Sequence, residues 1–430
     1  MLCARRAGDR RHRLLVREIY NMPYEECERT PSKVTWRTSF IEPILDKAER
    51  ESLSVIKVHS HPCGYPKFSE TDNESDKILL PMIRGWVEHN VPHGSVVMLP
   101  DGQMFGRVFE SEEFHPIEII NVVGDDLLFW YHDAGGKDVP SFAASHAQIF
   151  DDGTIERVKR LSVAVVGCSG TGSPLVEQLV RLGVGEIVLV DDDLVEDRNL
   201  NRILNSTMSD AEDKRLKVDV IGDAIERIGL GTRVIRLASN LWNADVVRSV
   251  AQCDLVFGCM DTVDGRFLLN ALATYYTIGY FDVGVRLEAN NSDENKGGVR
   301  EVCGTVHYLQ PGKSSLLTRD LFSLEQVAAA GLKRNDPKAF QQQLSDGYIA
   351  GAQGNRPAVI SVNMFASSLA VNELLARLHP FREEPNSVFA SVTFSLASME
   401  LLSDKDEGTC SVFGACVGHG DVRPLLGQME

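Results

Sequence analysis

The chain has 430 residues, of which 43% are hydrophobic and 24% are charged, and its formal net charge is -17. This composition is typical of a soluble protein with two or three domains, and the acid excess argues against binding to nucleic acid or to an anionic membrane surface. No apolar run reaches the about 20 residues that span a bilayer. The nine cysteines are scattered and odd in number, so we expect a reducing, cytoplasmic compartment with free or metal-bound thiols.

The first part of the chain is predicted to form short strands and turns around a loop rich in histidine. Apolar runs at 14–16, 54–58 and 95–99 predict three of the strands. Between 133 and 154 the composition shifts to Gly, Asp, Pro and Ser, which is typical of a linker. The predicted division is a first domain over 1–115, a linker with the helix that follows it over 116–154, and a second domain over 155–430.

In the second part of the chain, apolar strands alternate with helical periods. A helix is predicted from Ser173, because Pro174 then lies in its first turn, where a missing N–H does no harm. Strands that are apolar throughout and separated by helices imply a parallel sheet covered on both faces, so the expected fold class is α/β. The predicted strands lie at 162–166, 186–190, 234–237, 253–257 and 280–283.

Residues 59–72 contain side chains suited to a catalytic zinc ion. His59 and His61 are separated by one residue, so both point to the same side at the end of a predicted strand. Asp72 completes a set of three ligands that leaves a fourth position for water. Zinc lowers the pKa of bound water towards ~7, which supplies hydroxide at neutral pH. Ser69 can donate a hydrogen bond to the oxyanion of a tetrahedral intermediate.

The pattern H-x-H-P, six residues, S-x-x-D resembles the JAMM (MPN/JAB) metalloproteases, many of which cut isopeptide bonds after ubiquitin-like proteins. The resemblance implies a JAB/MPN-like α/β domain that binds Zn²⁺. Those proteases also use a Glu on the segment entering their first strand, and by resemblance residues 2–6 are that strand. We expect either an in-frame Glu upstream of Met1 or a domain without its base. The nearest acids within the chain are Glu18, Glu25 and Glu26.

The second motif is a glycine-rich loop in the context of a nucleotide site. Gly167, Gly170 and Gly172 follow a predicted strand and open a predicted helix, whose N-terminus attracts phosphate. Asp191 ends the next predicted strand, where a carboxylate binds ribose hydroxyls. Taken alone, this pattern favours a Rossmann-like nucleotide fold, and an NAD-dependent dehydrogenase is the default function.

The segment that follows argues against a dehydrogenase. Residues 191–202 resemble the D-x-D-x-V-x-x-x-N-L-x-R-Q signature of the ThiF/MoeB and ubiquitin-activating adenylyltransferases, with Ile203 in place of the final Gln. Lys217 resembles their helix-borne lysine, and residues 259–266 resemble their C-T-D-N-x-x-x-R segment. The match spans roughly 155–375 and implies that ATP transfers AMP to a C-terminal carboxylate.

This resemblance implies a role for each site residue. Arg202 and Lys217 neutralise the triphosphate, and Asn199 orients it. Asp261 holds Mg²⁺, which prefers carboxylate oxygen with phosphates and water. Asp191 fixes the ribose.

Purely structural roles stay open for several of these residues. Arg202 and Lys217 can instead be solvated helix charges, and Asp193 can simply cap its loop. Asp264 and Arg266 can form a structural ion pair.

The chain departs from these relatives in its cysteines. Many relatives hold a structural zinc with two C-x-x-C pairs, but residues 311–317 contain no Cys, and the tail offers only Cys410, Cys416 and His419. Relatives that form a thioester carry a Cys on the following loop, but residues 304–409 contain none. A tail zinc site therefore stays open, and the candidates for a thioester are Cys303, Cys410 and Cys416.

Both resemblances point to the same substrate class. We expect adenylation of a ubiquitin-like β-grasp protein, using ATP and Mg²⁺, fused to a Zn²⁺-dependent peptidase that processes or removes that protein, with a conjugating-enzyme homologue as a further partner. The alternative is sulfur-carrier activation through a thiocarboxylate, with an inactive JAMM-like docking domain. Relatives lend an Arg to the partner subunit, and residues 145–150 contain none, but we still expect a homodimer.

Overall fold

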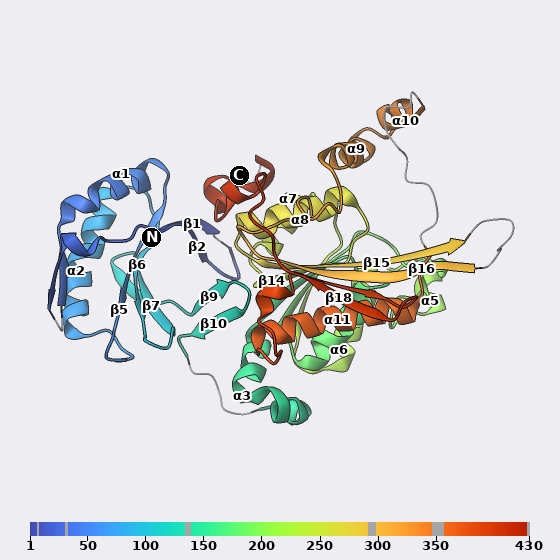
Figure 1. Cartoon of the computed structure of the whole chain (residues 1–430), viewed down its shortest axis with the longest axis horizontal. Coiled ribbons are helices and arrows are strands. Elements are labelled where there is room, and N and C mark those ends of the chain that lie inside the picture. Colours follow the sequence, from blue (N-terminus) through green and yellow to red (C-terminus); the bar gives the residue numbers. More distant parts are fainter. Residues whose placement is uncertain (7, 31–32, 134–138, 291–297, 346–356, 428–430) are drawn as a thin grey trace. The chain divides into compact units, whose positions relative to one another are not determined.

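The computed structural model describes residues 1–6, 8–30, 33–133, 139–290, 298–345 and 357–427 (Figure 1). The chain divides into two compact units, which are described separately below. Unit 1 comprises Met1–Val122, Leu128–Gly136 and Cys416–Glu430, and unit 2 comprises Val123–Leu127 and Lys137–Ala415. The predicted domain limits stay a prediction. Residues 134–138, in the middle of the predicted linker, lie outside the described residues.

Unit 1 is built on a six-stranded sheet with the order β2-β1-β5-β6-β7-β8. β5 and β6 run parallel because α2 connects them, and the other neighbours are antiparallel. The strands predicted at 14–16, 54–58 and 95–99 are confirmed as β2, β5 and β6. The strands are β1 (Leu2–Arg6), β2 (Arg13–Glu18), β5 (Ser54–Ser60), β6 (His93–Met98), β7 (Met104–Glu110) and β8 (Glu113–Pro116), and the helices are α1 (Glu42–Arg50) and α2 (Glu70–Trp86).

Two short hairpins complete the strands of this part of the chain. They are β3 (Cys27–Thr30) with β4 (Lys33–Trp36) and β9 (Ile119–Val123) with β10 (Leu127–Tyr131). The main core of unit 1 lies between the sheet and its two helices, where Leu2, Leu45 and Leu80 are buried. Burial of such side chains supplies the main driving force for folding.

The last described residues of the chain belong to unit 1. The short 3₁₀-helix η7 (Gly420–Val422) lies along β1, and Arg6 pairs with Asp421 at 2.8 Å. Val422 packs against the core that contains Leu2. Unit 1 is therefore assembled from both ends of the described chain.

Unit 2 contains an eight-stranded sheet with the order β13-β12-β11-β14-β15-β16-β17-β18. The first five strands are parallel, and β15 to β18 pair antiparallel. The parallel strands confirm the predicted α/β class. They are β11 (Ser162–Val166), β12 (Glu186–Val190), β13 (Arg233–Leu237), β14 (Leu255–Gly258) and β15 (Gly279–Asn290), followed by β16 (Gly298–Leu309), β17 (Ser391–Ser395) and β18 (Glu400–Asp404).

Helices cover both faces of this sheet. In Figure 1, α6 and α11 lie on one face and α7 and α8 on the other. β11 and β12 are buried along almost their whole length, as expected for strands covered on both sides. The helices are α3 (Ala144–Arg160), α4 (Gly172–Leu182), α5 (Met208–Glu212), α6 (Lys217–Ile228), α7 (Ala244–Val250), α8 (Val263–Tyr275), α9 (Leu324–Asn335), α10 (Pro337–Ser345) and α11 (Ile360–Leu378).

A helix was expected within 116–154, and α3 (Ala144–Arg160) begins there, with a kink at Asp151; Thr154, Ile155 and Val158 are buried and anchor its second part. One feature of unit 2 differs from the sequence-based expectation. The antiparallel strands β16 to β18 had no predicted counterpart. Within the described residues, no helix has the length and apolar character needed to cross a membrane.

β11 and β14 are neighbours in the sheet, and the strands that follow each of them are added on opposite sides. The chain passes from β11 to β12 and β13 on one side, and returns to β14 and β15 on the other. Ligands of open α/β sheets bind at such a switch point, beyond the carboxyl ends of the strands. In unit 2 this is the position of the glycine-rich loop after β11.

Candidate functional site

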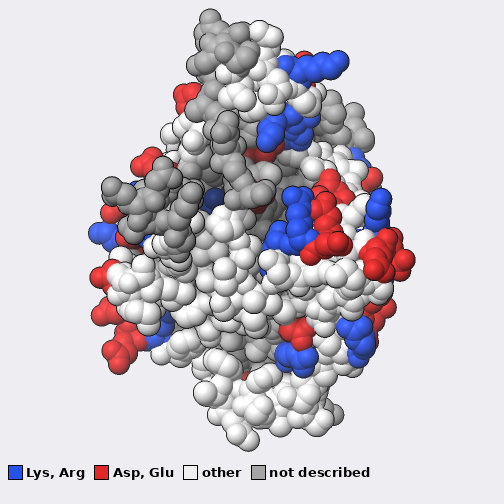
Figure 2. Space-filling view, turned by 90° about the vertical axis from the view of Figure 1, so that its right-hand side faces the viewer, with Lys and Arg blue, Asp and Glu red and all other residues white. Residues whose placement is uncertain are grey.

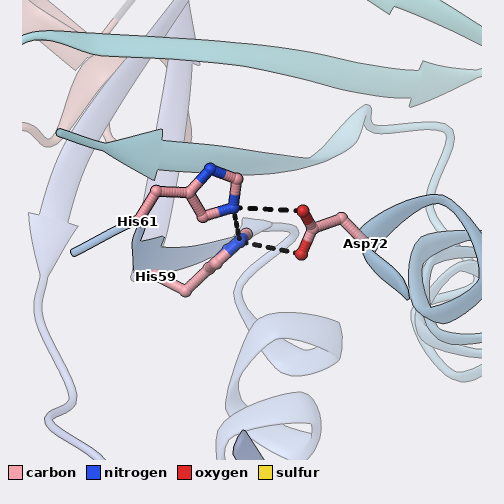
Figure 3. A group of neighbouring side chains, drawn as sticks. All are labelled: His59, His61 and Asp72. Atoms are coloured by element: carbon pink, nitrogen blue, oxygen red, sulfur yellow. Dashed lines mark hydrogen bonds and ion pairs between the residues drawn. The ribbon is translucent and has the colours of Figure 1, made fainter. Parts of the chain in front are cut away.

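In unit 1, the end of β5 and the start of α2 bring His59, His61 and Asp72 together (Figure 3). The Nε2 atoms of the two imidazoles are 3.3 Å apart, and the Asp72 carboxylate lies 2.9 Å from His59 Nε2 and 3.1 Å from His61 Nε2. Neighbouring ligand atoms around a tetrahedral zinc ion are about 3.3 Å apart, given zinc–nitrogen distances of ~2.0–2.1 Å. The three side chains predicted from the sequence therefore have the chemistry and the spacing of a zinc site.

Ser69 positions Asp72. Ser69 is the N-cap of α2, and its hydroxyl accepts a hydrogen bond from the backbone N–H of Asp72. In return, the backbone N–H and the hydroxyl of Ser69 both donate to Asp72 Oδ2, at 2.7 and 2.6 Å. This reciprocal cap fixes the first turn of the helix. The predicted oxyanion role of Ser69 stays a prediction, since the hydroxyl contacts the carboxylate here.

The imidazoles are held with Nε2 facing the carboxylate. His61 Nδ1 lies 2.8 Å from the backbone carbonyl of Tyr65, so Nδ1–H donates there and the Nε2 lone pair remains for a metal. Burial lowers the pKa of His59, which favours the neutral ring that metals bind. Burial raises the pKa of Asp72, but the hydrogen bonds from Ser69 and the electrostatic interactions with His59 and His61 outweigh it, so that pKa lies below its usual value.

Three charged residues behind this group were missed by sequence reasoning. Asp76 lies one turn after Asp72 on α2, is fully buried, and pairs with Lys57 and Arg107. Arg107 also donates to Asn73 Oδ1 at 2.6 Å and to the carbonyl of Asp72 at 3.3 Å. These contacts hold the start of α2 against strands β5 and β7 of the sheet. No short-range spacing marks this network, because Arg107 comes from β7.

The general base of unit 1 stays a prediction. Among the described residues, no glutamate joins the group formed by the two histidines and Asp72. Glu18 ends β2 and pairs with Lys47 at 2.6 Å. Glu25 and Glu26 are exposed in η1 (Tyr24–Glu26).

In unit 2, the loop from Gly167 to Gly172 links β11 to α4, as predicted. Gly172 begins α4, one residue before the predicted start. A Cβ atom at Gly172 would lie 1.9 Å from the carbonyl oxygen of Gly167, so this tight turn accepts only glycine. The N-terminus of α4 consequently opens at the carboxyl end of β11, where it can receive an anion.

Lys217 and Asp191 form a buried pair near the loop. Asp191 follows β12, and its Oδ2 accepts a hydrogen bond from the backbone N–H of Cys168 at 2.7 Å. Lys217 begins α6, is 5% exposed, and lies 2.5 Å from Asp193 Oδ2 and 3.6 Å from Asp191 Oδ1. Burial raises the pKa of Asp191. Lys217 is therefore no solvated helix charge, and Asp193 binds that lysine.

Arg202 presents a cation to the same region. Its guanidinium donates to the carbonyl of Arg198 at 2.7 Å and to the Asn201 side chain at 3.1 Å, and among the described residues no carboxylate pairs with it. Asn199 is buried, and its Oδ1 accepts a hydrogen bond from the backbone N–H of Glu196 at 3.2 Å. This bond stabilises the turn that precedes Arg202. An arginine without an anionic partner is suited to bind phosphate.

The segment after β14 gives one correction. The suggested pair of Asp264 with Arg266 is wrong: Asp264 pairs with Arg334, and Arg266 pairs with the buried Asp282. Positions two apart on a helix face different directions, so these two side chains of α8 do not meet. Asp261, the predicted Mg²⁺ ligand, is exposed between β14 and α8.

The cysteines differ in their suitability as nucleophiles. Burial, and then the nearby Glu301 carboxylate, raise the pKa of Cys303 to about 11, so its reactive thiolate is scarce at neutral pH. Cys410 is buried, and Cys416 is half-buried. The predicted tail zinc site draws Cys410 from unit 2 and Cys416 from unit 1, so it stays a prediction.

The acidic side chains do not form one continuous patch on the face shown in Figure 2. There, groups of acidic and basic side chains lie next to one another around a broad area without charged residues. Net charge alone therefore indicates no particular partner for this face.

Comparisons with known proteins give a consistent result for unit 2. Residues 143–411 match the sequence model of the ThiF family. The chain is 36% identical over 123 residues to the adenylyltransferase and sulfurtransferase UBA4 of Meyerozyma guilliermondii, covering 28% of each chain. It is 25% identical over 250 residues to the ubiquitin-like modifier-activating enzyme 5 of Culex quinquefasciatus, covering 54% of this chain and 58% of that protein.

Solved structures include a similar protein as well. The crystal structure of MccB from E. coli aligns with a TM-score of 0.46 and 16% identity, over 67% of this chain and 75% of that chain. The matches to the two relatives above span 28% and 58% of those proteins' lengths.

Proposed function

The chain belongs to the ThiF family, and from this premise we propose that unit 2 adenylates the C-terminal carboxylate of a ubiquitin-like or sulfur-carrier β-grasp protein. A carboxylate oxygen attacks the α-phosphorus of ATP, the bond from that phosphorus to the pyrophosphate oxygen breaks, and an acyl adenylate and pyrophosphate form. The names of the two similar proteins, a modifier-activating enzyme and an adenylyltransferase, support this class of reaction.

The observation that carries the proposal is the arrangement of charges around the glycine-rich loop. Arg202 has no carboxylate partner among the described residues, and the buried Lys217 lies beside Asp191. Such fixed cations stabilise the negative charge that builds up on the phosphates during transfer, and they need no reorganisation to do so. Asp261 would hold Mg²⁺, which neutralises further phosphate charge when bound.

The test is ATP–pyrophosphate exchange with the β-grasp protein encoded nearest this gene. Exchange should require the free C-terminal carboxylate and fall at least 100-fold in Arg202→Ala and Asp261→Ala, a loss typical for a removed transition-state contact. Arg198→Ala is the matched control, because Arg198 is an exposed neighbour that pairs only with Glu196 among the described residues. Equal exchange in all variants, or no ATP binding by the wild type, would overturn the proposal.

For unit 1 we propose a zinc-dependent peptidase that cleaves the same class of β-grasp protein from a precursor or a target. His59, His61 and Asp72 would hold the ion, and a bound zinc ion lowers the pKa of its water towards ~7. The support is the spacing of the three donor groups, 2.9 to 3.3 Å. The chain's own residues contribute the Nε2 atoms of His59 and His61, of which that of His61 is oriented by the bond to Tyr65, and the Ser69 hydroxyl.

Metal analysis and cleavage test this second proposal separately. Purified wild type should contain one zinc per chain, and His59→Ala and Asp72→Asn should lose it, whereas His89→Ala, at an exposed histidine of unit 1, should keep it. The wild type should also cleave a C-terminally extended β-grasp protein. Zinc without cleavage would favour a docking role for unit 1, and no zinc would refute the site.

A specific observation keeps sulfur-carrier activation as the second candidate for unit 2. Residues 304–409 contain no cysteine, and the raised pKa of Cys303 opposes thioester formation there. A thiocarboxylate product in mass spectra of the β-grasp protein would support sulfur transfer. A DTT-sensitive adduct on Cys410 or Cys416 would instead support transfer to a conjugating-enzyme homologue. A homodimer through unit 2 remains part of the proposal, and sedimentation measures it.

A further inference from the structure

Helix α11 lies directly over the glycine-rich loop. The hydroxyl of Ser367, on α11, donates a hydrogen bond to the carbonyl of Thr171 at 2.7 Å. This bond fixes the position of α11 along its axis, and its rotation about that axis, relative to the loop. The residue one turn earlier on the same side of the helix is Asn363, since positions four apart share a face.

Asn363 reaches the loop at Gly170. A Cβ atom at position 170 would lie 2.5 Å from Asn363 Nδ2 and 3.2 Å from Arg202 Cδ. Any larger residue there would therefore displace the amide. The Asn363 amide and the stem of Arg202 thus converge on Gly170 from two elements that are far apart in the sequence.

Asn363 is a largely buried residue whose side-chain amide has no hydrogen-bond partner among the described residues but keeps some contact with solvent. The residue is 5% exposed. Buried side-chain amides are normally paired, because leaving their donors and acceptor unpaired is costly. Nearby polar residues follow that rule: Ser367 donates to two carbonyls. An unpaired amide beside a phosphate-binding loop is therefore poised for a ligand.

We propose that Asn363 is a nucleotide-binding residue, whose amide NH₂ donates a hydrogen bond to a phosphoryl oxygen of ATP bound over Gly170. This inference rests on the proposed function of unit 2. The phosphates are the expected acceptor because Gly170 belongs to the loop at the N-terminus of α4 and Arg202 supplies a cation there. Asp191, the expected ribose ligand, lies at the end of the neighbouring strand β12. Asn363 adds a directional donor without adding charge.

The test compares Asn363→Asp and Asn363→Ala in equilibrium binding of ATP and of adenosine. Ala removes the donor and should weaken ATP binding about tenfold or more, as for other hydrogen bonds to charged groups. Asp is isosteric but places a negative charge against the phosphates, so it should weaken ATP binding more than Ala does. Adenosine carries no phosphate, so its affinity should stay within about twofold in both variants, which also reports an intact fold.

Asn372→Asp is the matched control, because Asn372 lies exposed on the same helix, where its side chain donates to Ser368. It should bind ATP as the wild type does. Wild-type ATP affinity in Asn363→Asp, or an equal loss of ATP and adenosine binding, would overturn the inference. If Arg202→Ala weakens ATP binding while Asn363→Asp does not, this inference alone fails. If the wild type binds no ATP, the proposed function fails, and this inference fails with it.

Discussion

Replacing Arg107 with alanine tests whether the buried charges behind His59, His61 and Asp72 hold unit 1 together. Arg107 is 16% exposed at its side chain, and it donates to Asp76 Oδ2 through Nη2 at 2.7 Å and through Nε at 3.1 Å. Removing one partner of a buried ion pair costs about 3–5 kcal/mol, because the other charge stays behind. Lys57 remains with Asp76, so we expect about 3 kcal/mol, a large share of a typical ~5–15 kcal/mol of total stability.

Urea unfolding followed by tryptophan fluorescence measures this loss, because three of the four tryptophans (Trp36, Trp86 and Trp130) belong to unit 1. The comparison variant is Arg84→Ala, which removes a partly exposed arginine 3.7 Å from Glu112. Such surface pairs contribute about 0–1 kcal/mol. The free energy of unfolding should therefore fall clearly more in Arg107→Ala than in Arg84→Ala. A loss below about 1 kcal/mol in Arg107→Ala, equal to that of Arg84→Ala, would refute it.

Three further predictions concern single groups. Burial lowers the pKa of His93 to about 4, so the unfolded chain takes up its proton first as pH falls below about 6.5. This histidine should therefore lower the free energy of unfolding by up to about 3 kcal/mol between pH 6.5 and 4 in urea titrations. His93→Gln should remove that contribution, while the contribution of His307, whose pKa burial also lowers to about 4, remains. Lys217→Met should reduce pyrophosphate exchange at least 100-fold; an unchanged rate would exclude the lysine from the site. Mass spectrometry after brief iodoacetamide treatment at pH 7.5 should find Cys303 unmodified while the exposed Cys63 reacts.

Local patterns account for most of what could be predicted. The turn at Gly172, the proximity of His59 and His61, and the parallel strands of unit 2 each depend on neighbours within a few residues of chain. Such features follow from backbone sterics and from the periodicity of apolar residues. The residues that form both candidate sites were consequently identifiable from the sequence.

Long-range contacts could not be predicted in this way. Arg107 reaches Asp76 from a different strand, and Asn363 reaches Gly170 from a helix almost two hundred residues later, so no spacing in the sequence links them. The suggested pair of Asp264 with Arg266 shows the opposite error, since closeness in sequence was taken for contact. β16 to β18 were missed because their alternation is partial: β18 is exposed along its whole length.

The contact between η7 and β1 has a consequence for how the protein is made. During synthesis, β1 leaves the ribosome early, whereas Asp421 and Val422 emerge only after all of unit 2. Domains generally fold as units while the chain grows. Unit 1 therefore gains its contacts with Asp421 and Val422 only after translation has passed the whole of unit 2, and a chain that stops early would lack them.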